Sequence, residues 1–117
     1  MAILTSHLLN GVDGTHAGNV TVELVQITTD GTRTSVFTSN SDDGGRFREE
    51  VSVGDAANMD YEMVIASGAY FADRDVSVTG TQILREIVIR FAMPDPNGHY
   101  HIPVIMSPNS YSCWWSS

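Results

Sequence analysis

Two histidines stand one residue apart near the end of the chain, in His99-Tyr100-His101. Successive side chains of a β-strand point to opposite faces, so both imidazoles would share one face and Tyr100 would take the other. Imidazole titrates near neutral pH, which suits it to accept a proton from water and return it to a leaving group. The same spacing is compatible with a metal site that recruits a third ligand such as His7, and with two half-exposed surface histidines.

Two further residues, His7 and Arg46, have types that could take part in catalysis. His7 lies in the largely apolar segment 4–9, where on its own it is most simply a histidine bonded to a backbone partner at a sheet edge. Arg46 directly follows the turn-like segment 41–45, which would present it at the start of a strand. Its guanidinium could pair with a neighbouring aspartate, an interaction worth little at a surface, or bind a carbonyl or developing oxyanion.

The chain ends in Trp114 and Trp115, followed by Ser116 and Ser117. Two indoles are costly to leave in water, so we expect an ordered tail that packs into a pocket or against another subunit. Cys113 is the only cysteine. A single cysteine excludes an internal disulfide and a multi-thiolate zinc site, and is compatible with a reducing compartment.

The elements that must position these side chains are short strands. Alternation of apolar and polar residues is clearest over residues 20–27, and turn clusters rich in Gly, Asp and Asn separate similar runs. Seven or so such strands predict a β-sandwich. Residues 71–86 are assigned no definite element: 73–75 and 79–81 look like loop, and 82–86 could hold one helical turn. The predicted strands cover residues 3–9, 20–27, 34–38, 47–53, 61–67, 87–91 and 100–106.

Composition limits the class of protein. A chain of 117 residues fits a single domain, 1–117, with one core. The net charge is -8 with only six Lys and Arg, which argues against nucleic acid or an anionic membrane as a partner. The first residues lack the basic region of a secretory signal, and no stretch is long enough to span a membrane. We therefore expect a cytoplasmic location.

Several motifs, in the same order along almost the whole chain, resemble the transthyretin-related 5-hydroxyisourate hydrolases. This resemblance implies an all-β, transthyretin-like sandwich with at most one short helix. It also implies a homotetramer, built as a dimer of dimers, with active sites in the channel between dimers. The matching segments are Ser6-His7-Leu8-Leu9, Gly45-Arg46, Ser67-Gly68-Ala69-Tyr70-Phe71, His99-Tyr100-His101-Ile102-Pro103, Ser107-Pro108 and Tyr111.

The resemblance also implies a reaction, in which the lactam ring of 5-hydroxyisourate is hydrolysed during urate degradation without a metal or organic cofactor. His7 and His101 would share the proton transfers, and Arg46 would orient the substrate and stabilise the oxyanion. Water would attack directly, because Cys113 shows no evident activation. Which histidine acts first as base stays open. The residues implied to bind substrate are His99, in a supporting role, Trp114, Trp115 and Ser117.

The tail departs from the family, whose hydrolases end in Tyr-Arg-Gly-Ser. Here Trp115 replaces a guanidinium with an apolar plane that carries one N–H, so we expect a less polar pocket. Our hypothesis is an N-methylated relative of 5-hydroxyisourate, with a methyl group packed on Trp114 or Trp115. Two smaller departures are Asn10, where the family commonly has aspartate, and a longer turn that could displace Arg46.

Three alternatives to this reading are kept open. The first is a hydrolase of another cyclic ureide, and the second is a transthyretin-like carrier that binds an aromatic small molecule without chemistry. A carrier has no need of His7, Arg46 and His101 together, so their joint presence favours the enzyme. The third alternative is an interaction module with a metal held by His7, His99 and His101.

Overall fold

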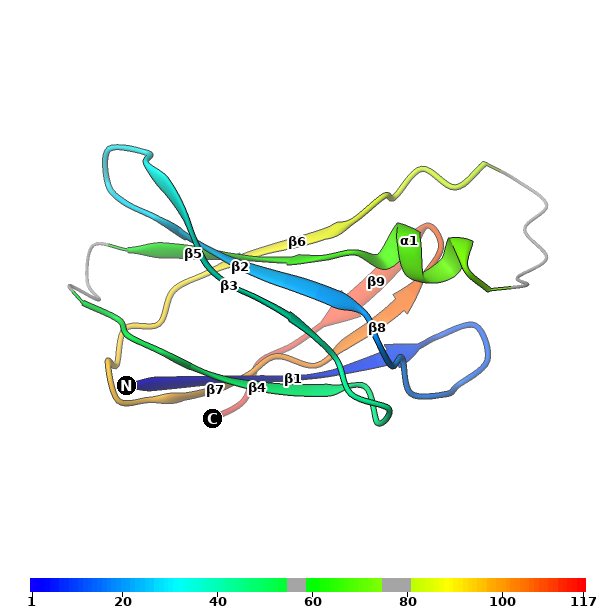
Figure 1. Ribbon diagram of the computed structural model, residues 1–117, viewed down its shortest axis with the longest axis horizontal. Coiled ribbons are helices and arrows are strands. Elements are labelled where there is room, and N and C mark those ends of the chain that lie inside the picture. Colours follow the sequence, from blue (N-terminus) through cyan, green and yellow to red (C-terminus); the bar gives the residue numbers. More distant parts are fainter. Residues whose placement is uncertain (55–58, 75–80) are drawn as a thin grey trace.

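The computed structural model describes residues 1–54, 59–74 and 81–117, which form nine strands and one short helix in two facing layers (Figure 1). One sheet has the strand order β4-β1-β8-β9, with β7 also paired to β1, and the other has the order β3-β2-β5-β6. The predicted all-β sandwich with at most one short helix is confirmed. The elements are β1 (Ala2–Asn10), β2 (Thr21–Ile27), β3 (Arg33–Asn40), β4 (Arg46–Val51), β5 (Asp60–Ile65), α1 (Ser67–Ala72), β6 (Ile87–Phe91), β7 (His99–His101), β8 (Val104–Ser107) and β9 (Ser110–Cys113).

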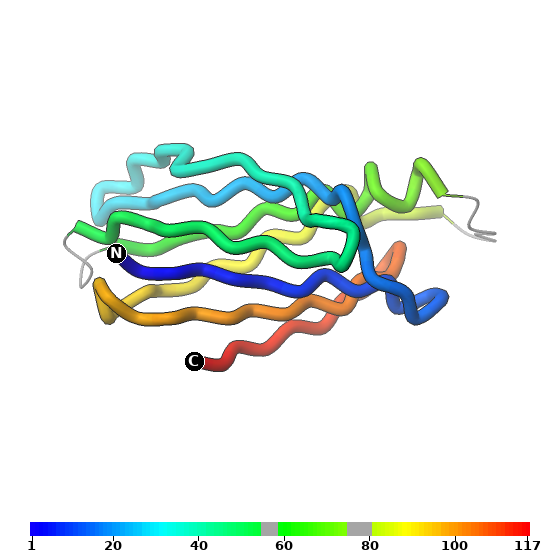
Figure 2. Tube along the Cα trace, turned by 60° about the horizontal axis from the view of Figure 1, so that its bottom comes forward, coloured from blue at the N-terminus to red at the C-terminus, as the bar shows by residue number. Residues whose placement is uncertain are grey.

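Strand β1 is the centre of its sheet. It pairs antiparallel with β4 on one side and parallel with β7 and then β8 on the other. Figure 2 shows these strands side by side, with the C-terminal segment along the outer edge. The sequence predicts one strand over residues 100–106, but the structure has two, separated by Ile102 and Pro103. Pro103 has no backbone N–H, and its position faces the C-terminal segment, which is the side to which His101 donates. The register is the same before and after the break, from Thr5↔His101 to Leu8↔Val104.

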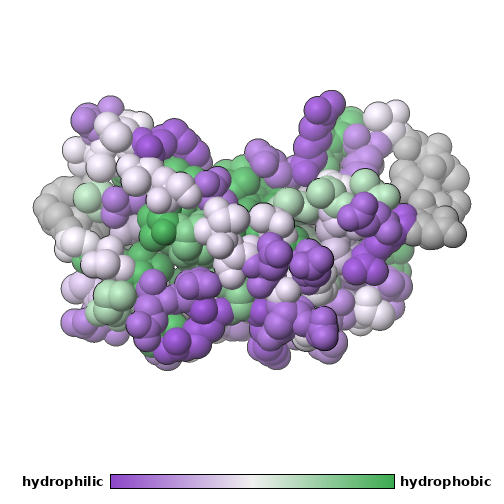
Figure 3. All heavy atoms as spheres, in the orientation of Figure 1, coloured by the Kyte–Doolittle hydropathy of each residue, from purple (hydrophilic) through white to green (hydrophobic). Residues whose placement is uncertain are grey.

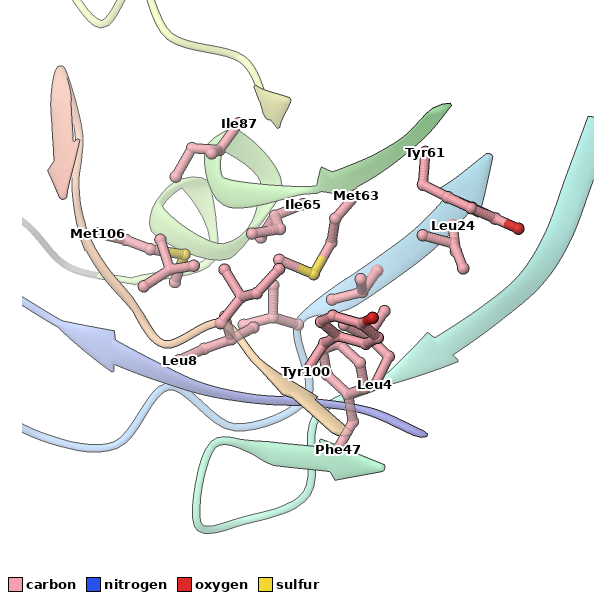
Figure 4. Packing of buried hydrophobic residues seen from close by; sticks show 14 of the residues in the cluster. Leu4, Leu8, Leu24, Phe47, Tyr61, Met63, Ile65, Ile87, Tyr100 and Met106 are labelled. Atoms are coloured by element: carbon pink, nitrogen blue, oxygen red, sulfur yellow. The ribbon is translucent and has the colours of Figure 1, made fainter. Parts of the chain in front are cut away.

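The core lies between the two sheets. β1 alternates without interruption between buried and half-buried residues, and Leu4 and Leu8 are fully buried. Figure 4 shows Leu4, Leu8 and Phe47 of one sheet facing Leu24 and Met63 of the other. Burying side chains of this size stabilises the fold by about 1.5–3 kcal/mol each. In Figure 3 hydrophobic residues show through the middle of the face, between more hydrophilic ones.

Two polar residues of β1 also point inward, and both are satisfied. The Ser6 hydroxyl donates to the carbonyl of Ile102 at 2.6 Å. The Asn10 amide donates to the Tyr70 hydroxyl at 3.2 Å, and its oxygen accepts the N–H of Val12 at 2.8 Å. Asn10 therefore ties the loop after β1 to helix α1.

The structure differs from the sequence prediction at a helix and at the last strand. Residues 67–72 form α1, whereas the sequence predicts a strand that ends at residue 67 and assigns no definite element from residue 71. Burial of Tyr70 and Phe71 outweighs weak local propensity there. Residues 82–86 form no helical turn. Of the predicted loops 73–75 and 79–81, residues 75, 79 and 80 lie outside the described residues. Strand β9 has only four residues, too few for their alternation to reveal a strand, and all four are exposed while they pair with β8.

No helix within the described ranges is long and apolar enough to cross a membrane.

Gly45 is required where the turn enters β4. Its φ is 76°, and an added Cβ would lie 2.3 Å from the carbonyl oxygen of Leu8. We expect Gly45→Ala to lower the free energy of unfolding by more than the roughly 1–2 kcal/mol that a left-handed conformation costs. Gly31→Ala is the matched control, since Gly31 has a φ of 87° with no atom within 4 Å of an added Cβ. Urea unfolding at fixed protein concentration compares them, and equal losses would show that the contact with β1 is unimportant.

Candidate active site

The pleat of β1 gathers the three predicted catalytic side chains on the outer face of one sheet. His7 pairs in register with Arg46 of β4, and Thr5 pairs with His101 of β7 on the other side. Paired residues of neighbouring strands share a face, and so do residues two apart in one strand. His7, Arg46 and His101 therefore lie on one surface across three adjacent strands.

Asp42 organises the turn that delivers Arg46. Its carboxylate accepts the backbone N–H groups of Gly44 and Arg46, each at 2.9 Å. The carbonyl of Gly45 accepts the N–H of Leu8 at 2.7 Å, which fastens the turn to β1. The longer turn therefore does not displace Arg46 from the position opposite His7. Within the described residues Arg46 has no ion pair with Asp42 or Asp43.

A small polar cavity, about 290 Å³ in volume, opens beside these residues. Arg46 of β4 and His101 of β7 both line it, together with residues of β1. The lining residues are Thr5, Ser6, Asp42, Arg46, Phe47, Arg48 and His101.

Thr5 orients the imidazole of His101. Its hydroxyl lies 2.8 Å from Nδ1 of the half-buried His101 ring. A hydroxyl can donate or accept, so the bond constrains the ring whichever tautomer is present. Nε2 is the ring nitrogen that this bond leaves for proton exchange.

His16 is a residue of this region that the sequence motifs do not predict. Its Nδ1 lies 2.8 Å from Nε2 of His7, and the two ring centroids are 4.9 Å apart. The turn-rich segment 10–14 is the signal that could have revealed it, because such a turn folds the following residues back along β1. An isolated antiparallel β-bridge between Leu9 and His16 forms where the chain comes back alongside β1.

The surroundings hold the pKa of His7 below its usual value. Partial burial is the largest cause, because it disfavours the charged imidazolium, and the nearby Arg46, His16 and His101 act in the same direction. A hydrogen bond with the backbone of Gly44 raises the pKa and offsets part of this effect. His7 therefore stays neutral, and able to accept a proton, at lower pH than an ordinary histidine.

The tail runs beside β7, where Ser116 pairs with His101 through two backbone hydrogen bonds of 2.9 Å. Trp115 lies 6.1 Å from Tyr100 between ring centroids. Trp114 and Trp115 are nevertheless 50% and 62% exposed, so the single chain does not bury them. Ser117 is exposed as well.

The indoles line an apolar groove of about 450 Å³ instead of the polar cavity. Tyr100 points away from the face of His101, so within one chain the structure does not bring the indoles and the predicted catalytic histidines into one cavity. Cys113 also belongs to this groove, and His99 is exposed on the face of His101. The groove residues are Ile89, Phe91, Ala92, Pro94, Tyr100, Ile102, Cys113, Trp114 and Trp115.

The metal alternative requires His7, His99 and His101 to converge. In residues 1–54, 59–74 and 81–117, no three side chains of His, Cys, Asp or Glu are grouped so that they could hold a metal ion.

The electrostatics of His7 can be tested by replacing Arg46. Removing the guanidinium in Arg46→Gln favours the imidazolium, so the pKa of His7 should rise relative to the wild type. The measurement is the titration of the His7 ring protons by NMR. Arg33→Gln, on the other sheet, removes the same charge at a distance and should leave the His7 titration in place. An unchanged His7 pKa in Arg46→Gln would contradict the placement of the two side chains.

Comparison with known proteins identifies the family of the chain. The 5-hydroxyisourate hydrolase of Deinococcus radiodurans is 33% identical over 97% of this chain and 95% of that protein. That of Ralstonia nicotianae is 30% identical over the full length of both.

Solved structures agree on the fold. Sea bream transthyretin in complex with thyroxine superposes with a TM-score of 0.77 at 25% identity, covering 97% of this chain and 93% of the other. (S)-allantoin synthase gives a TM-score of 0.80 at 26% identity over 99% of this chain, which spans only 44% of that one. The expected transthyretin-like fold is confirmed. Residues 4–115 also match the model of the HIUase/Transthyretin family, and the chain belongs to that family.

Proposed function

We propose that this chain is a hydrolase that opens the lactam ring of 5-hydroxyisourate, or of a close analogue such as an N-methylated one, in purine degradation without a cofactor. The observation that carries the proposal is the placement of His7, Arg46 and His101 on one sheet face beside a polar cavity. It is joined by full-length similarity to proteins named 5-hydroxyisourate hydrolase.

The chemistry divides among these three side chains. The oxygen of a water molecule forms a bond to the lactam carbonyl carbon, and one of the two imidazoles takes the proton that the water loses. The C–N bond then breaks, and the ring nitrogen receives a proton from an imidazolium. The guanidinium of Arg46 stabilises the negative charge that builds on the carbonyl oxygen. His7 and His101 share the transfers as coupled groups, so neither is assigned alone as the base.

The proposed assembly is a homotetramer built as a dimer of dimers. Strands β4 and β9 form the edges of one sheet and β3 and β6 those of the other, and every residue of β9 is exposed. Open edges and exposed apolar grooves favour association, and a second copy would cover Trp114 and Trp115. A single domain over residues 1–117, a cytoplasmic location and a small-molecule substrate, with no nucleic-acid or membrane partner, complete the proposal.

The carrier alternative has one observation in its favour, the structural likeness to transthyretin solved with thyroxine. A carrier would bind an aromatic ring without accelerating any reaction. Binding without turnover of 5-hydroxyisourate, its methylated form or another cyclic ureide would favour this alternative.

Replacing His101 tests the catalytic assignment. General acid–base catalysis contributes about 10²–10⁴-fold to a rate, so His101→Asn should lower kcat by that order. The measurement is the ultraviolet decay of freshly generated 5-hydroxyisourate, with light scattering to check assembly. His99→Asn makes the same change two residues away and should cost much less. A wild-type rate in His101→Asn would remove this residue from the mechanism.

The tail hypothesis predicts the choice of ring. Within one chain the indoles line a groove apart from the histidines, so they would have to reach the substrate through a neighbouring subunit. Burial of one methyl group is worth about 0.8 kcal/mol, or about a fourfold rate difference. Trp115→Arg should therefore lower the kcat/KM ratio of methylated to unmethylated substrate several-fold, whereas Trp115→Phe should largely keep it. An unchanged ratio in Trp115→Arg would end the hypothesis.

A further inference from the structure

The contact between His7 and His16 is not used by the proposed mechanism. Nε2 of His7 and Nδ1 of His16 are 2.8 Å apart, and the ring planes differ by 27°. His7 is half-buried, whereas His16 is exposed. A side chain thus lies within hydrogen-bond distance of a proposed catalytic imidazole and also meets solvent.

The backbone holds His16 in this place. The N–H of Asn10 donates to the carbonyl of Thr15 at 2.8 Å, and the N–H of Ala17 donates to the carbonyl of Leu8 at 2.9 Å. These two bonds flank His16 and pair its segment with the end of β1, just beyond the turn that carries Arg46. His16 lies opposite Leu9, so it shares the outer face with His7.

Two imidazoles at this distance restrict each other's protonation. When both rings are neutral, one donates a hydrogen to the other, and that choice sets the tautomer of both. When one proton is added, the bond becomes charge-assisted and stronger. When a second is added, two cations face each other and neither nitrogen can accept, so the doubly protonated pair is disfavoured.

We propose that His16 is a positioning residue of the proposed active site, which holds the ring of His7 through Nε2 and makes the two imidazoles take up one proton between them. The inference rests on the proposed function. A proton gained by His7 is shared with a ring in contact with solvent, and the orientation of His7 relative to Arg46 is fixed before substrate binds.

Other charges near His7 act together with His16. Arg46 and His101 lower the pKa of His7, as His16 does. The charged and titratable groups on the elements around His7 are Arg46, Arg48, Glu49 and Glu50 of β4, His99 and His101 of β7, Asp42 and Asp43 of the turn, and Asp13 and His16 of the loop after β1.

The test uses the full chain with His16→Ala and His16→Gln. NMR titration of the imidazole ring protons should show coupled, two-step titration of His7 in the wild type. In both variants it should show a single step, at higher pH than the second and lower step of the wild type, because the repelling charge is gone. The acid limb of the pH profile of kcat/KM should likewise shift to higher pH. His16→Ala should also lower the plateau several-fold, and His16→Gln should restore it, because an amide can still bond Nε2.

Thr15→Ala controls for disturbance of the loop. It removes the 2.7 Å bond from the Thr15 hydroxyl to Asp13 but leaves His16 in place, so it should change neither measurement. A His7 titration that is the same in His16→Ala as in the wild type would overturn the inference even if the protein hydrolyses 5-hydroxyisourate. If the titration shifts but the protein has no hydrolase activity, the result would support the coupled pair and contradict the proposed function.

Discussion

The uninterrupted alternation of β1 is the constraint on which the rest of the structure depends. Its inward residues are fixed by the core, since Leu4 and Leu8 are fully buried and a slip of one residue would put them in water. That burial sets Thr5 and His7 on the outer face. Because β1 also pairs with β4, β7 and the segment around His16, the same register places every polar group of the candidate site.

The candidate site concentrates positive and potentially positive groups on a chain whose net charge is -8. Arg46, His16 and His101 all oppose protonation of His7, and their crowding costs stability whenever both imidazoles of the pair are charged. The same crowding suits the proposed reaction. It keeps an imidazole neutral to receive a proton, and it surrounds a developing oxyanion with donors that are already in place.

The sequence predicted the parts of the molecule that follow from local pattern. Alternation revealed most strands, and the His-x-His spacing correctly placed His99 and His101 on one face. Helix α1 was missed because burial of Tyr70 and Phe71 creates it, and β9 was missed because only backbone pairing holds it. The partnership of His7 with His16 could not be read from spacing alone, since it depends on how the loop after β1 returns. The separation of the indoles from His101 likewise depends on which face of the sheet their side chains take when the tail pairs with β7.

The central claim is that this sheet face hydrolyses the 5-hydroxyisourate ring. The most direct measurement is the ultraviolet decay of freshly generated 5-hydroxyisourate at several concentrations of the purified protein, with the substitution of both His7 and His101 by Asn as a reference. Our account predicts a decay rate that rises in proportion to protein concentration and returns to the spontaneous rate in the doubly substituted protein. A decay rate independent of the wild-type protein, for both this ring and its N-methylated form, would contradict it.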